Sequence, residues 1–246
     1  MTYEPFEIVN GEARSRWLIT CDHAANTVPP FVNGGQLGLA AGDMQRHIAY
    51  DVGAAGVARE LARLLDAPAV LSNFSRLVID PNRGEDDPTL LMKLYDGTII
   101  PGNRHAGPDA LQERLNRCYR PYHDAVARLA ARQDDTVIVS IHSYTRQLQG
   151  RAPRPWHVGI LYAADTRFSK PLLDLLRAES DLCVGENEPY GGHLPGDAIA
   201  RHAIAHQRHN TLIEIRNDLI ETDDDQIAWA ARLAPLLRRA LAHVGD

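Results

Sequence analysis

Several features that would tie a protein to a membrane, to the cell exterior or to nucleic acid are missing from these 246 residues. There is no run of about eighteen apolar residues and no leader of charged, apolar and small residues, so we expect neither a membrane span nor a secretory signal. The three cysteines, Cys21, Cys118 and Cys183, form no close pair, which argues against a cysteine-based zinc site and fits a reducing cytoplasm. The net charge of −6 provides no basic surface for nucleic acid.

The chain does contain apolar runs with strand character that alternate with stretches of helical periodicity. We expect helices at 51–65, 108–132, 167–178, 197–206 and 223–243, and strands near 17–21, 69–71, 77–79, 136–141, 158–162 and 211–215. This alternation predicts a single α/β domain over 1–246, with a mixed, mostly parallel sheet covered by helices on both faces. The Pro- and Gly-rich stretches 84–108 and 187–196 are long enough to be active-site loops. The oligomeric state stays open.

A histidine stands at the point where an apolar run turns polar in two segments. His142 follows the run at 136–141, and His23 follows the run at 17–21. This pattern is typical of buried strands that carry a side chain to the carboxyl edge of an open α/β sheet, where such folds bind their ligands. A lone strand-end histidine is more often a hydrogen-bonded structural residue. Two on neighbouring strands, however, could together bind zinc, which accepts neutral histidine nitrogen.

A catalytic zinc site typically takes three protein ligands and leaves one position for water, so a third ligand is needed. Asn26 has a suitable spacing from His23 if a helical turn follows the strand, but an amide oxygen is a poor ligand beside a carboxylate. Asp51 is the better chemical candidate, because it opens the predicted helix 51–65 and can turn its carboxylate back toward the sheet edge. Asp is also a preferred N-cap residue, so the residues alone leave the role of Asp51 open.

Two arginines flank the short predicted strand at 77–79. Arg76 precedes it, and Arg83 follows it in an Asp-Pro-Asn-Arg turn that also contains Asn82. The planar, permanently charged group of Arg83 suits a carboxylate, and Arg76 can polarise a carbonyl and hold a developing oxyanion. The alternative for Arg83 is a surface salt bridge with Asp80.

Glu214 interrupts the apolar strand predicted at 211–215. A buried carboxylate needs a partner, and the water at a metal site would be one. Desolvation would raise the pKa of Glu214 toward the range useful for a general base. The alternative is a solvated strand face or a pair with Arg216.

The other histidines carry less weight. His202, His206 and His209 fall at near-helical spacing, and we expect a solvated helix face because no carboxylate accompanies them. The roles of His123, His193 and Tyr144 stay open.

Together these segments resemble the N-formylglutamate amidohydrolase family, which is related to the zinc carboxypeptidases and to the succinylglutamate desuccinylase and aspartoacylase enzymes. Residues 140–144 are similar to the carboxypeptidase segment that supplies a zinc histidine, and residues 80–83 to the Asp-x-Asn-Arg substrate-binding turn of the wider group. Residues 213–216 match its catalytic-glutamate strand, and 187–190 is a further family-like stretch. The carboxypeptidases carry a glutamate where this chain has Asn26, whereas the amidohydrolases have an aspartate before the first helix, which favours Asp51 as the third ligand.

The resemblance implies a zinc-carboxypeptidase-like fold and a divalent metal, zinc. The implied roles are metal ligation by His23, Asp51 and His142, catalysis by Glu214 and Arg76, and substrate binding by Asn82, Arg83 and Tyr190. The implied reaction is metal-dependent hydrolysis of a small anionic N-acyl amino acid, N-formyl-L-glutamate, to formate and L-glutamate, a step of histidine degradation. The alternatives are deacylation of another N-acyl amino acid, a carboxypeptidase-like activity, and a non-catalytic small-molecule binding protein.

Overall fold

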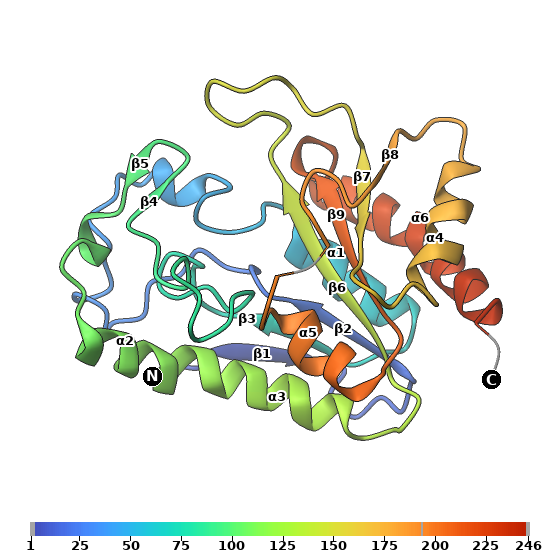
Figure 1. The fold of residues 1–246 in the computed structure, drawn as a ribbon, viewed down its shortest axis with the longest axis horizontal. Coiled ribbons are helices and arrows are strands. Elements are labelled where there is room, and N and C mark those ends of the chain that lie inside the picture. Colours follow the sequence, from blue (N-terminus) through green and yellow to red (C-terminus); the bar gives the residue numbers. More distant parts are fainter. Residues whose placement is uncertain (1–2, 193, 245–246) are drawn as a thin grey trace.

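The computed structural model describes residues 3–192 and 194–244, which form a mixed, mostly parallel sheet between two layers of helices (Figure 1). The sheet has seven strands in the spatial order β1-β3-β2-β6-β9-β7-β8. Their bounds are β1 Phe6–Val9, β2 Trp17–Cys21, β3 Ala69–Ser72, β6 Val137–Tyr144, β7 Val158–Leu161, β8 Val184–Glu186 and β9 Asn210–Arg216. β1 runs antiparallel to β3 and β7 antiparallel to β9, and the other pairs are parallel. The predicted α/β class is therefore confirmed.

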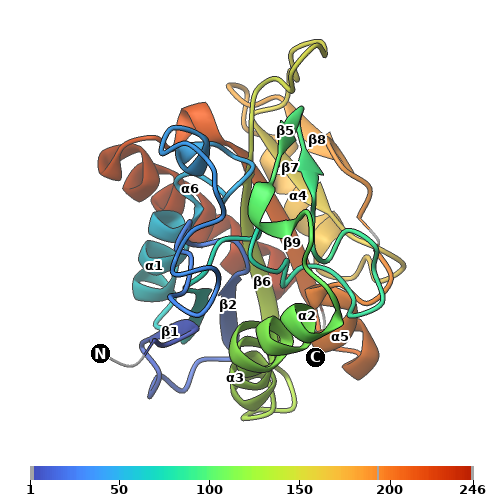
Figure 2. The same ribbon diagram turned by 90° about the vertical axis from the view of Figure 1, so that its left-hand side faces the viewer.

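The two helical layers cover opposite faces of the sheet (Figure 2). On one face α1 (Ala54–Leu64) and α4 (Ser169–Arg177) both pack against α6 (Asp223–Ala242). On the other face lie α2 (Pro108–Arg114), α3 (Arg120–Ala130) and the short α5 (Ala198–His202). None of the helices in the described part of the chain is long and apolar enough to cross a bilayer.

The central strands are apolar throughout because both of their faces are buried. In β2, Ile19 packs into the core beneath α1 and α6, while its neighbour Leu18 packs into the core beneath α3. Val139 and Ile138 divide in the same way in β6. Consecutive strand side chains point to opposite faces, so an unbroken apolar run is what a strand covered on both sides requires.

The predicted strand at 77–79 is wrong, because these residues lie in a turn. The Ser75 hydroxyl accepts from the Leu77 amide at 3.1 Å, and the Ser75 carbonyl accepts from the Val78 amide at 2.8 Å. A serine that bonds nearby backbone groups competes with a strand ladder. The apolar side chains are still buried, so their hydrophobicity reflects core packing rather than a strand.

Other elements differ from the expected ones in extent. The predicted helix 108–132 contains a π-helical stretch, Leu115–Tyr119, between α2 and α3, and the predicted helix 197–206 continues after α5 only as a short 3-10 turn. β1 and β8 were not predicted. The predicted loop 84–108 contains a small hairpin of β4 (Leu94–Tyr95) and β5 (Thr98–Ile99).

Candidate metal centre and active site

One cavity of about 470 Å³ collects every residue to which the sequence assigned a role in metal binding, catalysis or substrate binding. These residues are His23, Asp51, Arg76, Asn82, Arg83, His142, Tyr190 and Glu214. The volume lies within the range of small-molecule sites, roughly 300 to 1,000 Å³. The cavity also includes His47, Tyr95 and Asp197, to which the sequence gave no role.

The sheet and one loop bring the first three of these residues together. β2 and β6 are parallel neighbours, so His23, just beyond β2, lies near His142 in β6. Asp51 does not open α1, as the sequence suggested, but lies three residues before it; the helix begins after Gly53, which has a φ of 78°. The Asp51 amide donates to the His23 carbonyl at 2.9 Å, and the Ser143 amide donates to Asp51 Oδ2 at 3.2 Å. The Asp51 carboxylate is therefore held against both strands.

Gly53 makes this loop possible. A Cβ at this position would lie 2.1 Å from the carbonyl oxygen of Ile220, and the positive φ is one that side-chain-bearing residues rarely adopt. Glycine has no Cβ and adopts a positive φ readily, so it meets both requirements. The chain can therefore turn into α1 directly after the loop that holds Asp51.

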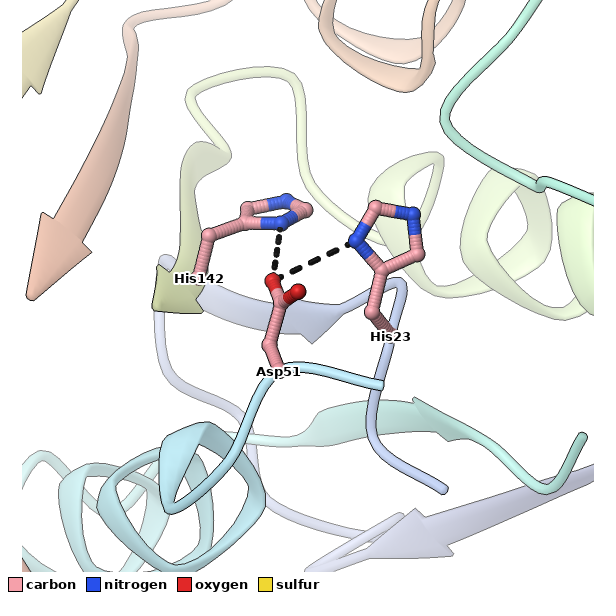
Figure 3. A group of neighbouring side chains, drawn as sticks. All are labelled: His23, Asp51 and His142. Carbon is pink, nitrogen blue, oxygen red and sulfur yellow. Dashed lines mark hydrogen bonds and ion pairs between the residues drawn. The ribbon is translucent and has the colours of Figure 1, made fainter. Parts of the chain in front are cut away.

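The two imidazoles meet at one carboxylate oxygen (Figure 3). Nδ1 of His23 lies 3.2 Å from Asp51 Oδ2, and Nδ1 of His142 lies 2.8 Å from the same atom. All three side chains are buried, and one ligand atom from each lies within 4.8 Å of the others. Two imidazole nitrogens and one carboxylate oxygen are donors that zinc accepts at catalytic sites, so these residues fit a divalent metal.

The outer nitrogen of each imidazole faces a second buried carboxylate. Nε2 of His23 lies 2.7 Å from Asp80 Oδ1, and Nε2 of His142 lies 3.0 Å from Asp22 Oδ2. A carboxylate at Nε2 favours the tautomer that carries its proton there and leaves Nδ1 free to coordinate a metal. Neither contact was predicted from the sequence, although Asp22 directly precedes His23 and Asp80 begins the Asp-Pro-Asn-Arg turn.

The electrostatics of this cluster favour positive charge. Burial alone would lower the pKa of His142, but its hydrogen bonds to Asp22 and Asp51 outweigh burial and raise that pKa well above its usual value. Burial would raise the pKa of Asp51, yet His23 and His142 hold it well below its usual range. Charged carboxylates facing inward suit a bound cation.

Arg76 and the Asp-Pro-Asn-Arg turn are joined to the cluster through Asp80. Arg76 Nη2 donates to Asp80 Oδ2 at 2.7 Å, and the Asn82 amide donates to Asp80 Oδ1 at 2.9 Å. Arg76 is buried, and its Nε has no hydrogen-bond partner among the described residues. Asp80 thus pairs with Arg76 and His23 rather than with Arg83, so the surface salt bridge considered for Arg83 is not formed.

The side chains of Asn82 and Arg83 are oriented by their neighbours. The backbone amide of Ala198, at the start of α5, donates to Asn82 Oδ1 at 3.3 Å. Because a backbone N–H can only donate, the oxygen of Asn82 must face the helix, which leaves its NH2 group to donate elsewhere. Arg83 donates from Nη1 to the Asn82 carbonyl at 2.7 Å and from Nε to Thr89 at 3.1 Å.

Glu214 lies in β9 directly opposite His142 in the strand register. Its side chain is 7% exposed, and its Oε2 is buried with no partner in the described chain. Burial raises the pKa of Glu214 to about 7. The alternative of a pair with Arg216 is wrong, since Arg216 donates to Asp218 at 2.7 Å.

Two tyrosines also line the cavity. Tyr190, in the loop after β8, accepts a hydrogen bond from Arg154 at 3.1 Å. Tyr144, whose role the sequence left open, donates to the Trp156 carbonyl at 2.5 Å. His193 of the same loop as Tyr190 lies outside the described residues.

Three residues considered from the sequence lie outside the cavity lining. Asn26, the alternative third ligand, donates its amide to the Met44 carbonyl at 2.8 Å and does not line the cavity. His202 is not on a solvated face, because it is 4% exposed and stacks on His123. His123 is also buried and lies outside the cavity lining.

Comparisons with known proteins show which solved structures and which family the chain is similar to. The crystal structure of the gene product Atu2144 of Agrobacterium tumefaciens is similar to this chain, with a TM-score of 0.91 and 34% identity over 99% of this chain and 97% of that one. An N-formylglutamate amidohydrolase from Ralstonia eutropha has a TM-score of 0.64 and 21% identity, with coverage of 96% and 98%, and a bacteriophage poly-gamma-glutamate hydrolase has a TM-score of 0.52 and 11% identity, with coverage of 98% and 90%. The last two likenesses show the fold alone.

No curated protein matches the sequence. The family model for N-formylglutamate amidohydrolase matches residues 15–221, which include all the cavity residues discussed above. The resemblance seen in the sequence is thereby confirmed, and the chain belongs to the N-formylglutamate amidohydrolase family.

Proposed function

We propose that this protein hydrolyses the amide bond of a small anionic N-acyl amino acid, N-formyl-L-glutamate, in a reaction that depends on a divalent metal, zinc. Family membership supports an amidohydrolase. The observation that carries the proposal is that one cavity is lined by three residues that could hold a metal ion, by the carboxylate of Glu214, whose Oε2 has no hydrogen-bond partner in the described chain, and by the turn with Asn82 and Arg83. This combination supplies what amide hydrolysis needs in one place.

His23, Asp51 and His142 would hold the metal. A divalent metal bound there would polarise the amide carbonyl and lower the pKa of a water molecule beside it. The short separation of their ligand atoms, all within 4.8 Å of one another, supports this role, because two imidazole nitrogens and a carboxylate oxygen are donors that a divalent metal accepts.

Glu214 would act as the general base and then as the general acid. Its Oε2 has no hydrogen-bond partner in the described chain, so it is free to accept a proton from the attacking water. A pKa raised to about 7 by burial suits both steps, since the same group must then return the proton to the departing nitrogen. Protonation of that nitrogen makes the amine a leaving group.

The two arginines would bind different negative charges: the oxyanion that forms during the reaction and a carboxylate of the substrate. Arg76, held by Asp80 beside the metal donors, would stabilise the oxyanion that develops on the amide oxygen. Asn82, whose NH2 group is free to donate, and Arg83 would bind a carboxylate of the substrate. Tyr190, which lines the same cavity, would contact the substrate.

The proposal can be tested by measuring formate and glutamate release by the purified protein. We expect turnover that disappears after chelation and returns when zinc, but not magnesium, is added back. Formyl-glutamate would be compared with formyl-aspartate, acetyl-aspartate, succinyl-glutamate and short peptides. Full activity after complete metal removal would contradict metal dependence, and faster turnover of another substrate would identify a different deacylase or a peptidase. Binding without turnover on the whole panel would point to a binding protein.

A further inference from the structure

We propose that Asp22 and Tyr122 form a buried positioning arm for the metal ligand His142. The inference rests on the proposed metal site and not on the identity of the substrate. Neither residue lines the cavity, so both would act through His142 rather than on the substrate. Asp22 and Tyr122 are 1% and 0% exposed.

The arm connects two strands and a helix that are far apart in sequence. Asp22 follows β2, and its Oδ2 lies 3.0 Å from Nε2 of His142 in β6. Tyr122, in α3, donates its hydroxyl proton to Oδ1 of the same carboxylate at 2.6 Å. Ser140 donates to Asp22 Oδ2 at 3.3 Å. The α3 layer is thereby linked to a ligand of the candidate metal site.

These contacts leave the carboxylate little freedom to turn. Oδ1 is held by Tyr122, and Oδ2 faces His142 and Ser140. Tyr122 itself packs edge-on against Phe74, with ring centroids 6.4 Å apart. Because an ionised carboxylate can only accept hydrogen bonds, His142 must present an N–H at Nε2, which directs its other nitrogen toward Asp51.

Asp22 is a better position than Asp80 for testing how a carboxylate orients a metal ligand, because Asp22 contacts fewer of the other site residues. Asp80 holds His23 but also bonds Arg76 and the Asn82 amide, so its loss would disturb the oxyanion and carboxylate groups as well. Asp22 bonds His142, Tyr122 and Ser140 and has no arginine partner. Removing its charge therefore weakens a contact with His142 and leaves the bonds of Asp80 to Arg76 and to the Asn82 amide in place.

The test is the metal affinity of Asp22→Asn, measured by competition with a chromophoric chelator. We expect the Kd for zinc to rise about 10- to 100-fold, the usual effect of removing a partner that orients a metal ligand. The visible absorption of the cobalt-substituted protein should change as well, because it reports the geometry of the ligands. Ser169→Ala, which deletes a buried hydrogen bond to the Asn210 carbonyl outside the cavity, should leave both readouts unchanged.

Tyr122→Phe keeps the inference testable if Asp22→Asn does not fold. It removes only the hydroxyl that holds Oδ1, so we expect a smaller rise in the Kd for zinc, about twofold or more. A folded Asp22→Asn protein with the wild-type Kd and cobalt spectrum would overturn the proposal. If Asp22→Asn does not fold, a Tyr122→Phe protein with the wild-type Kd for zinc and the wild-type cobalt spectrum would overturn the proposal instead.

The same measurements separate this inference from the proposed function. A protein that binds zinc more weakly after Asp22→Asn, yet turns over no substrate of the panel, supports the arm and contradicts the proposed reaction. If the protein shows metal-dependent turnover and Asp22→Asn leaves the Kd for zinc unchanged, the proposed reaction is supported and the positioning arm is overturned. A wild-type protein that binds no divalent metal overturns both.

Discussion

Two pairs of buried histidines lie in the part of the chain that the structure describes, and they differ in what surrounds them. The rings of His23 and His142 are 4.9 Å apart and edge-on, and those of His123 and His202 are 5.1 Å apart and stacked. All four side chains are at most 4% exposed. In the first pair each ring nitrogen faces a carboxylate oxygen. In the second pair Nδ1 of His123 meets Nε2 of His202 at 2.8 Å.

The difference shows that the partners of a buried imidazole, and not its burial, decide its charge. Burial lowers the pKa of His123 to about 3 and that of His202 to about 4. Equal burial at His142 is outweighed by two carboxylates, which raise its pKa well above the usual value. The first pair therefore lies in a site suited to a cation, and the second is a neutral part of the core.

The largest expected effect separates the two pairs directly. His142→Ala should reduce bound zinc from about one equivalent to near zero and lower turnover by more than about 100-fold, since loss of a ligand should exceed the effect of losing its orienting partner. His202→Ala should keep its zinc. Elemental analysis of both purified variants checks this, and zinc loss from His202→Ala alone would reverse the assignment of the two pairs.

Glu214→Gln should separate metal binding from proton transfer within the cavity. The amide keeps the shape of the side chain but cannot accept the proton, so we expect kcat to fall by about 10² to 10⁴. Zinc content should stay at the wild-type level, in contrast to His142→Ala. A Glu214→Gln protein that turns over at the wild-type rate would show that another group acts as the base.

Arg83→Ala should have a smaller effect, on substrate binding. If Arg83 binds a carboxylate equally well in the ground and transition states, KM should rise about 10-fold or more while kcat changes little. Two substrate analogues, each with one carboxylate replaced by a neutral carboxamide, would identify the carboxylate that Arg83 binds. The KM of the analogue that lacks this carboxylate should no longer change on Arg83→Ala. Equal sensitivity of both analogues would argue against a direct contact.

The sequence predicted the cavity residues better than it predicted their surroundings. Residues such as Glu214 and His142 were found because a polar side chain inside an apolar run is a local signal. The role of Asp22 was missed, since its contact with Tyr122 joins positions 100 residues apart and leaves no local pattern.

Tertiary packing also explains the errors in local structure. The run at 77–79 is apolar because it is buried, and a short apolar run does not distinguish a strand from a buried turn. His202 was expected on a solvated face because its partner His123, which lies in another helix, could not be seen from spacing. Both errors have the same cause: burial depends on residues distant in the sequence.

The smallest expected effect is a change in how stability depends on pH. The folded-state pKa values of His123 and His202, about 3 and about 4, lie below the usual value of 6.5. At pH values between the folded-state pKa and 6.5, the unfolded chain binds more protons than the folded one. The stability that comes from keeping these imidazoles neutral is therefore complete above pH 6.5 and is lost as the pH falls toward 4. Each imidazole should lower the free energy of unfolding by about 1 kcal/mol per pH unit in this window.

His202→Phe removes one of the two titrating groups while keeping an aromatic ring in the stack. Urea unfolding at pH 7, 6 and 5 should therefore show a shallower loss of stability in this variant than in the wild-type protein, by about 1 kcal/mol per pH unit. Ser169→Ala, which deletes a buried hydrogen bond and no titrating group, is the control for a general loss of stability and should keep the wild-type slope. Because the carboxylate-bound pair is present in all three proteins, its own titration cancels from the differences. Parallel curves for wild type and His202→Phe would mean that the second pair is not held neutral in the core, and the contrast between the two pairs would be lost.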